Sequence, residues 1–236
     1  MSFKQELTKD LKEYIKDREF MSATGISRRA ELEFLAQGEY NINYLLEDEE
    51  EKYVLRLNLG SQMDLDDQIG YEFSALKALA PSGVTPRPFY LDNSREKLDY
   101  GLLMMEYLPG RHLDYQKDLK AAAKVFARIH KLDVESADRL IREEKPLTAI
   151  WNECDSLLAE YFDSELADPE IKDFLRRMKA DLAEKKEREA ELMDLFPLAL
   201  VNTEVNSNNF LINDQFNLAY LVDWEKPLVT SPLQDL

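Results

Sequence analysis

Cysteine and histidine are scarce in this chain. Among 236 residues there is one cysteine, Cys154, and there are two histidines, His112 and His130. A single cysteine excludes an intrachain disulfide, which is consistent with a reducing compartment such as the cytosol. Two histidines are too few for a histidine-rich metal site. Cys154 lies in a helical pattern, so we expect a buried structural thiol there rather than a nucleophile.

Basic residues are also few. The chain has 30 lysines and arginines against 47 aspartates and glutamates, a formal net charge of −17. Nonspecific nucleic-acid binding requires a basic surface, so we expect no nucleic-acid partner. The acidic excess is explained first by solubility, and a cationic substrate is the second interpretation.

Long apolar runs are lacking. No run approaches the ~20 residues of a transmembrane helix, and the first ten residues, MSFKQELTKD, are too charged for a signal peptide. We therefore expect a soluble, cytoplasmic protein with no membrane partner. Only seven glycines and nine prolines occur, and 44% of the residues are hydrophobic, which indicates a folded core and no low-complexity chain.

The first half of the chain has the pattern of a sheet with one inserted helix. Asp64 or Asp66 is suited to cap that helix. The first three strands follow one another closely, which indicates an antiparallel meander. The predicted elements are a helix over 3–19, strands over 31–36, 42–46 and 52–57, a helix over 64–80, and strands over 88–92 and 100–107.

The second half is predicted to be mainly helical, with short strands at its end. The segment Leu108-Pro109-Gly110 interrupts the pattern between the two halves. We therefore expect an α+β protein of two lobes, with an N-terminal lobe over 1–108 and a C-terminal lobe over 109–236. The predicted elements are helices over 114–131, 147–163 and 169–192, and strands over 198–203, 209–213 and 218–223.

Three residues of the first half are candidates for phosphate chemistry. Gly38 lies in a turn between two strands, where backbone N–H groups can contact a phosphate, although taken alone it is explained first by a plain hairpin turn. Arg56 on the third strand can bind phosphate oxygens with two hydrogen bonds, or can face solvent. Glu72 on the following helix can brace Arg56, or can be an ordinary exposed glutamate.

Polar residues at the end of the chain adjoin short apolar strands. The stretch VNTEVNSNNFLI contains Glu204 and Asn209, and LVDWE contains Asp223. Carboxylates beside a core are costly unless a cation meets them. The pattern therefore raises the question of a metal ion at this end of the chain.

Several segments resemble the aminoglycoside phosphotransferase and choline kinase-like family, which has a protein-kinase-like fold. The segment LLMMEYLPG over 102–110 resembles the family's hinge, with its pattern apolar–Met–Glu–x–x–x–Gly. FARIH over 126–130 is similar to the family's LAxLH helix end. VDWE over 222–225 and Asn209 match the family's catalytic segment, HxDxxxxN followed by IDWE.

The chain departs from that pattern at several positions. Asn202 stands where the family has histidine, Glu204 replaces the catalytic aspartate, and Arg56 replaces lysine. The printed sequence ends at 231–236, where family members usually continue from a similar Pro-x-x-Asp-Leu into helices that carry much of the acceptor site. The resemblance therefore implies an incomplete C-terminal lobe.

The resemblance implies an ATP- and Mg²⁺-dependent phosphotransferase that acts on a hydroxyl group of a small molecule. Met104 and Met105 would lie at the back and edge of the adenine pocket. Magnesium prefers oxygen ligands, often one or two carboxylates together with substrate phosphates. The implied roles are phosphate contact at Gly38 and Arg56, support of Arg56 by Glu72, adenine binding by backbone groups of Glu106 and Leu108, Mg²⁺ binding by Asn209 and Asp223, and action of Glu204 as the catalytic base.

Alternative interpretations stay open from the sequence. The substitutions at Asn202 and Glu204 also fit a pseudokinase that binds nucleotide without transfer, and the acidic helical half fits a non-catalytic interaction protein. Glu225 can act near the metal or form a surface ion pair. The residues expected to be structural are Tyr40, Asn41 and Asn43 in a hairpin, His130 at a helix C-terminus, and Trp224 packed under the metal loop.

Overall fold

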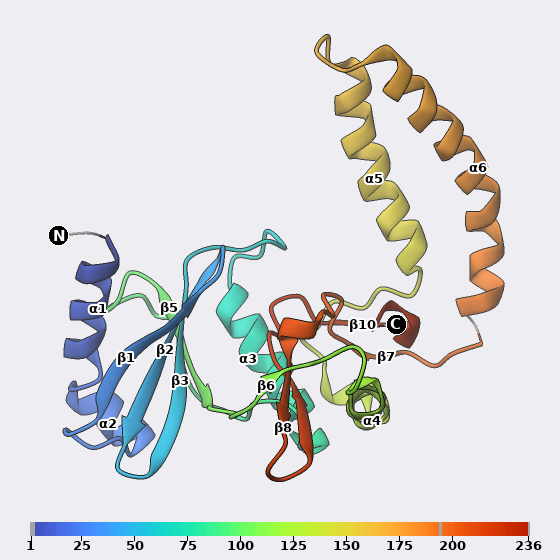
Figure 1. Cartoon of the computed structure of the whole chain (residues 1–236). Helices are drawn as coiled ribbons and strands as arrows, with labels where there is room; N and C mark the ends of the chain where they lie inside the picture. Colours follow the sequence, from blue (N-terminus) through green and yellow to red (C-terminus); the bar gives the residue numbers. More distant parts are fainter. Residues whose placement is uncertain (1–2, 194, 236) are drawn as a thin grey trace.

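A five-stranded antiparallel sheet forms the first half of the molecule (Figure 1). The computed structural model describes residues 3–193 and 195–235. The strand order is β1-β2-β3-β5-β4, so the predicted antiparallel meander of the first three strands is confirmed. The strands are β1 (Glu31–Gln37), β2 (Asn41–Asp48), β3 (Glu51–Asn58), β4 (Pro88–Asp92) and β5 (Gly101–Glu106).

The alternation of side chains along β3 determines which residues lie on each face of the sheet. Leu55 and Leu57 pack into the core under the two N-terminal helices, whereas Val54 lies in the core on the opposite face. Arg56 shares the face of Val54, because successive strand residues point to opposite sides. One face of the sheet is thus purely apolar, and the other combines an apolar core with a buried cation.

The N-terminal helices cover the apolar face (Figure 1). Our expectation of one helix over 3–19 was wrong, because the chain forms α1 (Phe3–Tyr14) and α2 (Arg18–Thr24). The Asp17 side chain accepts hydrogen bonds from the backbone N–H groups of Glu19 and Phe20, and so begins a second helix.

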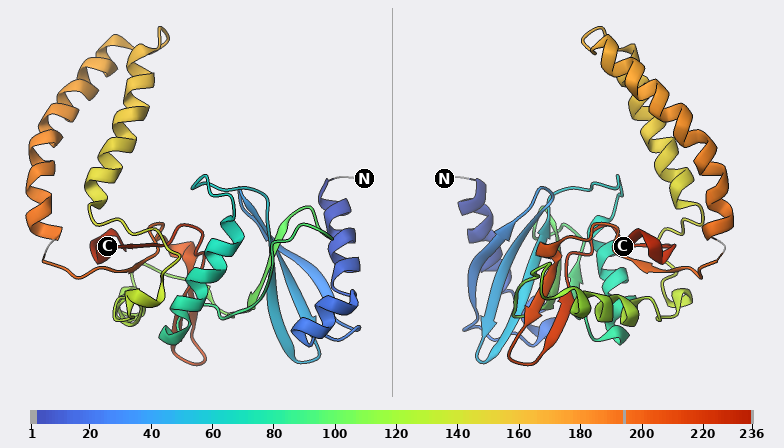
Figure 2. Two further views of the ribbon diagram at one scale, coloured as in Figure 1. Left: turned by 180° about the vertical axis from the view of Figure 1, so that it is seen from behind. Right: turned by 45° about the vertical axis from the view of Figure 1, so that its right-hand side comes forward.

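Helix α3 (Gln68–Leu79) lies on the other side of the sheet, between the two halves of the molecule (Figure 2). It begins later than predicted, because the side chain of Asp67, and not that of Asp64 or Asp66, accepts the hydrogen bond from Gly70 N at 3.0 Å. A Cβ atom on Gly70 would come within 2.1 Å of Asp67 Oδ2, so a larger residue at position 70 would force the Asp67 side chain to move.

The second half is built around α4 (Leu119–Ile129) and two small sheets. Its short strands were predicted at 198–203, 209–213 and 218–223, and they occur there with shorter bounds. Two strands were not predicted, because each has only two or three residues and depends on a distant partner. The small sheets have the orders β6-β8-β9 and β10-β7, with β6 (Arg111–His112), β7 (Ala199–Val201), β8 (Phe210–Asn213), β9 (Leu218–Leu221) and β10 (Leu228–Thr230).

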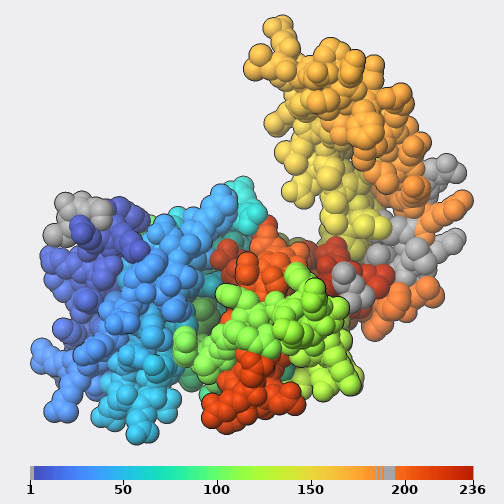
Figure 3. Space-filling view, in the orientation of Figure 1, coloured from blue at the N-terminus to red at the C-terminus, as the bar shows by residue number. Residues whose placement is uncertain are grey.

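Helices α5 (Pro146–Asp163) and α6 (Pro169–Met193) form a hairpin that projects from the second half (Figures 1 and 2). The space-filling view shows the hairpin standing clear of the sheet, with an open hollow between them (Figure 3). Both helices confirm the sequence prediction to within one residue at each end. Cys154 on α5 is exposed, so our expectation of a buried thiol was wrong.

One apolar core extends through both halves of the molecule. It joins Val54 and Met105 of the sheet to α3, and it continues to Phe126 of α4, to Leu200 of β7 and to the fully buried Trp224. The segment between β5 and β6 connects the halves, and we propose residue 108 as the lobe boundary. Within the described parts of the chain, no helix has both the length and the apolar character needed to cross a bilayer.

Candidate active site

A cavity of about 150 Å³ lies between the sheet and the second half of the molecule. Its wall is formed by β3, α3, the connection after β5 and the segment after β9. Five of the eight residues that the sequence singled out line it, although they are far apart in the chain. They are Arg56, Glu72, Glu106, Leu108 and Asp223.

Arg56 is the central charged group of this cavity, and it is only 6% exposed. Its Nη1 atom donates to Glu72 Oε1 at 2.6 Å and to Asp223 Oδ1 at 3.2 Å. Glu225 Oε1 lies 3.5 Å from the same nitrogen. Its Nε atom donates to Asn43 Oδ1 at 3.0 Å. The structure thus brings Arg56 and Glu72 into direct contact and adds two further carboxylates.

The three carboxylates carry more negative charge than Arg56 can neutralise. Burial raises the pKa of Glu72, against the effect of Arg56. Burial, followed by the charge of Asp223, raises the pKa of Glu225 to about 7. Burial alone would lower the pKa of Arg56, but Glu72 and the other carboxylates raise it overall, so the guanidinium stays charged. The sequence left open whether Glu225 acts near the metal or forms a surface ion pair; the structure places it inside this cluster.

The loop after β7 holds Glu204 through backbone contacts. Asn209 Nδ2 and Asn206 Nδ2 both donate to the carbonyl oxygen of Glu204, at 2.9 and 3.2 Å. Asn202 Nδ2 donates to the carbonyl oxygen of Asp223 at 2.8 Å. The loop that carries Glu204 and the loop that carries Asp223 are therefore joined directly by Asn202.

The carboxylate of Glu204 contacts a lysine that the sequence reading did not select. Lys226 Nζ lies 2.7 Å from Glu204 Oε1. Thr203 Oγ1 donates to the carbonyl oxygen of Lys226 at 2.7 Å. Thr203 and Asp223 have φ angles of 68° and 67°, in the left-handed region that non-glycine residues seldom adopt. Such backbone strain is typical of functional sites.

Asn209 and Asp223 are compatible with a magnesium site. Asn209 donates from its amide nitrogen to the carbonyl oxygen of Glu204, so its amide oxygen is the atom that could bind a metal. Val222 N donates to the carbonyl oxygen of Asn209 at 2.8 Å, so the residue before Asp223 touches Asn209. Among the described residues there is no group of three or more His, Cys, Asp and Glu side chains suited to a metal. An ion held here would therefore complete its ligands with phosphate oxygens, as Mg²⁺ commonly does.

Not all of the other residues predicted to contact the nucleotide line the cavity. Gly38 lies at the β1–β2 turn, where its N–H donates to Asn41 O at 2.9 Å, and it does not line the cavity. Met105 lines the cavity, but Met104 faces the opposite core under α1 and α2, so it does not form the back of this pocket. The N–H of Glu106, at the end of β5, donates to Arg87 O, just before β4, at 2.8 Å.

Several supporting residues were missed or read as purely local. Asn43 was assigned to a hairpin, yet it lies directly opposite Arg56 in the β2–β3 register and hydrogen-bonds to it. Asp235 accepts a hydrogen bond from the N–H of Asn202 at 2.9 Å and contacts His130 Nε2 at 2.8 Å. His130 is the C-cap of α4, as expected. The register of the β2–β3 hairpin could have identified Asn43; no local signal identifies Asp235.

A second cavity of about 510 Å³ lies beside the Glu204 loop, at the base of the hairpin. Thr203, Leu228 and Gln234 form one side, and two acids of the hairpin side, Glu143 and Glu153, form the other. Among the residues that the structure describes, no lysine or arginine lines this cavity.

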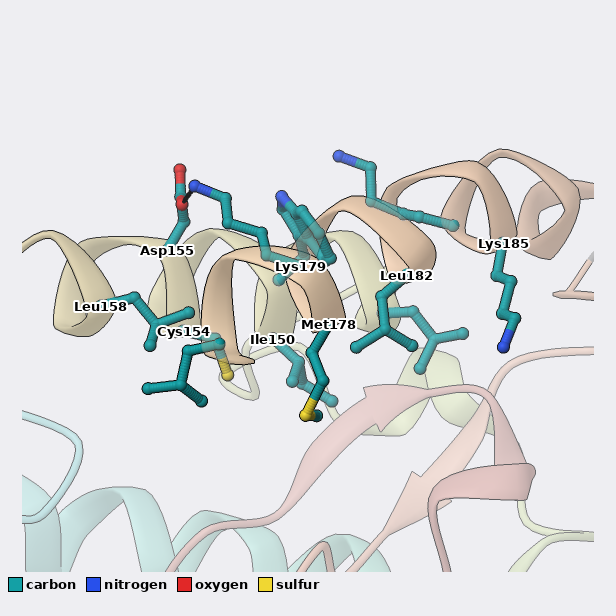
Figure 4. Close-up of a pocket in the computed structure, with 12 residues that line it drawn as sticks. Ile150, Cys154, Asp155, Leu158, Met178, Lys179, Leu182 and Lys185 are labelled. Carbon is teal, nitrogen blue, oxygen red and sulfur yellow. Dashed lines mark ion pairs between the residues drawn. The ribbon is translucent and has the colours of Figure 1, made fainter. Parts of the chain in front are cut away.

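This second cavity continues into an apolar groove of about 360 Å³ between α5 and α6. Leu147 and Ile150 line both spaces. In Figure 4, Ile150, Met178 and Leu182 lie along the groove, and Asp155 pairs with Lys179 across its upper edge. A path of mainly apolar side chains therefore leads from Thr203 along the hairpin.

The two-lobed fold with a charged cleft is that of protein-kinase-like small-molecule phosphotransferases. The model of the Phosphotransferase enzyme family matches residues 31–236, so the chain belongs to this family. No curated protein matches the chain. Family membership agrees with the resemblance seen in the hinge and in the VDWE segment.

Solved structures share the fold at low sequence identity. A spectinomycin phosphotransferase, in complex with ADP and spectinomycin, is 16% identical with a TM-score of 0.60; the match covers 96% of this chain and 71% of that one. For an ethanolamine kinase of Plasmodium vivax the identity is 15%, the TM-score 0.64 and the coverage 93% and 63%. For a choline kinase of Cryptosporidium parvum Iowa II these values are 15%, 0.62, and 95% and 66%. The chain therefore spans about two thirds of the length of these structures.

Proposed function

We propose that the protein is an ATP- and Mg²⁺-dependent phosphotransferase that transfers the γ-phosphate of ATP to a hydroxyl group of a small molecule. The observation that carries this proposal is the convergence of Arg56, Glu72 and Asp223, from three distant segments, in one cleft. Structures of similar fold were solved with ADP, with AMP and with AMP-PNP, which supports a nucleotide as the ligand.

The proposed roles follow from what phosphoryl transfer requires. The reaction needs neutralised phosphates, a positioned metal and an oriented acceptor, with little covalent chemistry from the protein. Arg56, held by Glu72, binds phosphate oxygens, and Asn209 and Asp223 hold the metal. A bound magnesium ion would neutralise the charge on the phosphates. Glu204 orients the acceptor hydroxyl and accepts its proton.

The adenine and phosphate contacts complete the nucleotide site in this proposal. Backbone groups of Glu106 and Leu108, which line the cavity, bind the adenine ring. The turn at Gly38 covers the phosphates. Met105 supplies an apolar contact at the edge of the ring.

The acceptor is proposed to enter through the cavity beside Thr203. Glu143 and Glu153 favour a cationic group there, and the neighbouring groove of Figure 4 offers contacts to an apolar portion. A hydroxyl-bearing molecule with a positive charge fits both features. The similar structures include a spectinomycin phosphotransferase, an aminoglycoside phosphotransferase with bound hygromycin B, a choline kinase and an ethanolamine kinase. These names support a small-molecule acceptor.

The replacement of Asp223 by alanine tests the proposal. Removal of a preorganised group that stabilises the transferred phosphate costs on the order of 100-fold or more in rate. Asp223→Ala should therefore lower ATP turnover at least ~100-fold, while circular dichroism and thermal unfolding show an intact fold. Asp99→Ala, which removes an exposed carboxylate on the β4–β5 connection, is the matched control. Equal turnover in Asp223→Ala and the wild type would contradict the metal-binding role.

A nucleotide-binding protein without transfer activity is the second candidate function. The contact between Glu204 and Lys226 favours it, because the proposed base is already engaged by a cation. Binding of Mg–ATP by a protein that shows no turnover with any hydroxyl-bearing acceptor would select this candidate over the enzyme.

A further inference from the structure

Lys226 is a cation next to the proposed catalytic base. Its Nζ atom lies 2.7 Å from Glu204 Oε1, within hydrogen-bond distance. Lys226 follows Asp223 by three residues, so one short segment carries both a proposed metal ligand and this cation. The pair therefore spans the gap between the loop of Glu204 and the loop of Asp223.

Among the described residues, the other polar contacts of Glu204 use its backbone and not its carboxylate. Asn206 and Asn209 bind its carbonyl oxygen, and its N–H donates to Asn202 Oδ1 at 3.3 Å. Within the described part of the chain, the Glu204 carboxylate forms one ion pair, with Lys226. The direction of this carboxylate accordingly depends on Lys226.

Lys226 is itself held in place. Thr203, the residue before Glu204, donates from its hydroxyl to the carbonyl oxygen of Lys226 at 2.7 Å. Thr203 adopts a φ angle of 68°, which is unfavourable for a β-branched residue. Backbone and side chain of Lys226 thus meet two consecutive residues of the same loop, and this is a firmer arrangement than that of a mobile surface lysine.

The Glu204–Lys226 ion pair adds little to the stability of the fold, but it can fix the position of the Glu204 carboxylate. The side chains of Glu204 and Lys226 are 41% and 22% exposed, and exposed ion pairs add little to stability. By contrast, a displacement of a reacting group by ~1 Å can lower a rate ~100-fold. Glutamate is longer than aspartate by one C–C bond, about 1.5 Å, so a base of this length needs a partner that fixes its end.

We propose that Lys226 is a positioning residue that holds the Glu204 carboxylate where the acceptor hydroxyl binds. This inference rests on the proposed phosphotransferase function. Lys226 acts through Glu204, and it makes glutamate usable at a position where the resemblance to the family leads one to expect aspartate.

Steady-state hydrolysis of Mg–ATP, with water as the acceptor, tests the role of Lys226. In Lys226→Met, kcat should fall ~100-fold, while KM for ATP and the thermal unfolding temperature stay at the wild-type values. Lys226→Arg should recover most of the rate, because a guanidinium also binds a carboxylate. The control is Lys117→Met. Lys117 pairs with Asp114 at 2.9 Å, and it does not line the cavity that contains Arg56.

A double variant separates positioning from a general loss of charge. Glu204→Asp shortens the side chain and breaks the contact with Lys226. If Lys226 acts through Glu204, adding Lys226→Met to Glu204→Asp should cause no further loss of kcat, since the effects of coupled residues are not additive. Multiplicative losses would contradict the proposal, as would wild-type kcat in Lys226→Met or equal losses in Lys117→Met.

The crystal structure of Lys226→Met gives a readout that does not depend on turnover. The proposal predicts a displaced or disordered Glu204 carboxylate in that variant, whereas a carboxylate in its wild-type place would overturn it. If the wild-type protein binds Mg–ATP but turns none over, the phosphotransferase function fails, and this structure still decides whether Lys226 positions Glu204.

Discussion

One guanidinium faces three carboxylates in the cleft, and this imbalance is the main chemical fact at the scale of single residues. Arg56 contacts Glu72, Asp223 and Glu225. Buried carboxylates without a compensating cation are costly. Burial and mutual repulsion raise the pKa of Glu225 to about 7, which is the expected response. A divalent cation at Asp223 would remove the imbalance, in line with the proposed Mg²⁺ site.

Asp118 provides a test of the electrostatics outside the cleft. Hydrogen bonds from Arg111, together with the N–H of Asp114, lower the pKa of Asp118 from 3.8 to about 2. A lowered folded-state pKa adds stability above pH ~3.8, and this contribution is lost as the pH falls towards ~2. Asp118→Asn should therefore unfold at a lower temperature than the wild type at pH 7. The difference should shrink between pH 4 and pH 2.

Thermal unfolding of both proteins across that pH range measures this effect. Asp138→Asn, at an exposed aspartate, is the control. A difference that stays constant down to pH 2 would show that Arg111 does not hold Asp118 ionised in the folded state.

The sequence selected the charged residues of the cleft better than the residues that support them. Asp223 was selected because a carboxylate beside apolar strands is costly. Arg56 was selected because a guanidinium can bind phosphate oxygens, and Glu72 because it can brace Arg56. Asn43 was assigned only to a hairpin and Lys226 was not selected, because their partners lie on the neighbouring strand and in a separate loop. The roles of all these residues stay predictions.

At the scale of elements, the two hairpin helices α5 and α6 were predicted more accurately than the shortest strands. The prolines Pro146 and Pro169 stand at the first positions of α5 and α6, and the apolar periodicity extends to their ends, so both bounds could be read locally. Strands β6 and β10 have two and three residues, and only their pairing with β8 and β7 defines them. Tertiary contacts of this kind have no signal in a local pattern.

The start of α3 gives a test at this scale, because the sequence and the structure indicate different caps. The Asp67 side chain accepts from Gly70 N and from Asn93 Nδ2, at 3.0 and 2.9 Å. Loss of an N-cap costs about 1 kcal/mol. Asp67→Ala should therefore lower the unfolding temperature by roughly 2–4 °C, whereas Asp66→Ala should leave it unchanged. An equal decrease in both variants would contradict the cap assigned from the structure.

At the scale of the whole molecule, two halves share one apolar core and enclose the charged cavity between them. Trp224 and Val54 belong to the same buried cluster, although they come from different halves of the chain. A ligand in the cavity contacts β3, α3 and the segment after β9 together. Binding of nucleotide should therefore stabilise both halves as a unit.

Thermal unfolding with and without Mg–ATP tests this account most directly. A ligand at 100 times its dissociation constant stabilises the folded state by about 2.7 kcal/mol. We expect a clear rise in the unfolding temperature that requires both Mg²⁺ and ATP, that is lost in Asp223→Ala and that persists in Asp99→Ala. A cooperatively unfolding protein whose temperature does not change with Mg–ATP would contradict the proposed nucleotide site.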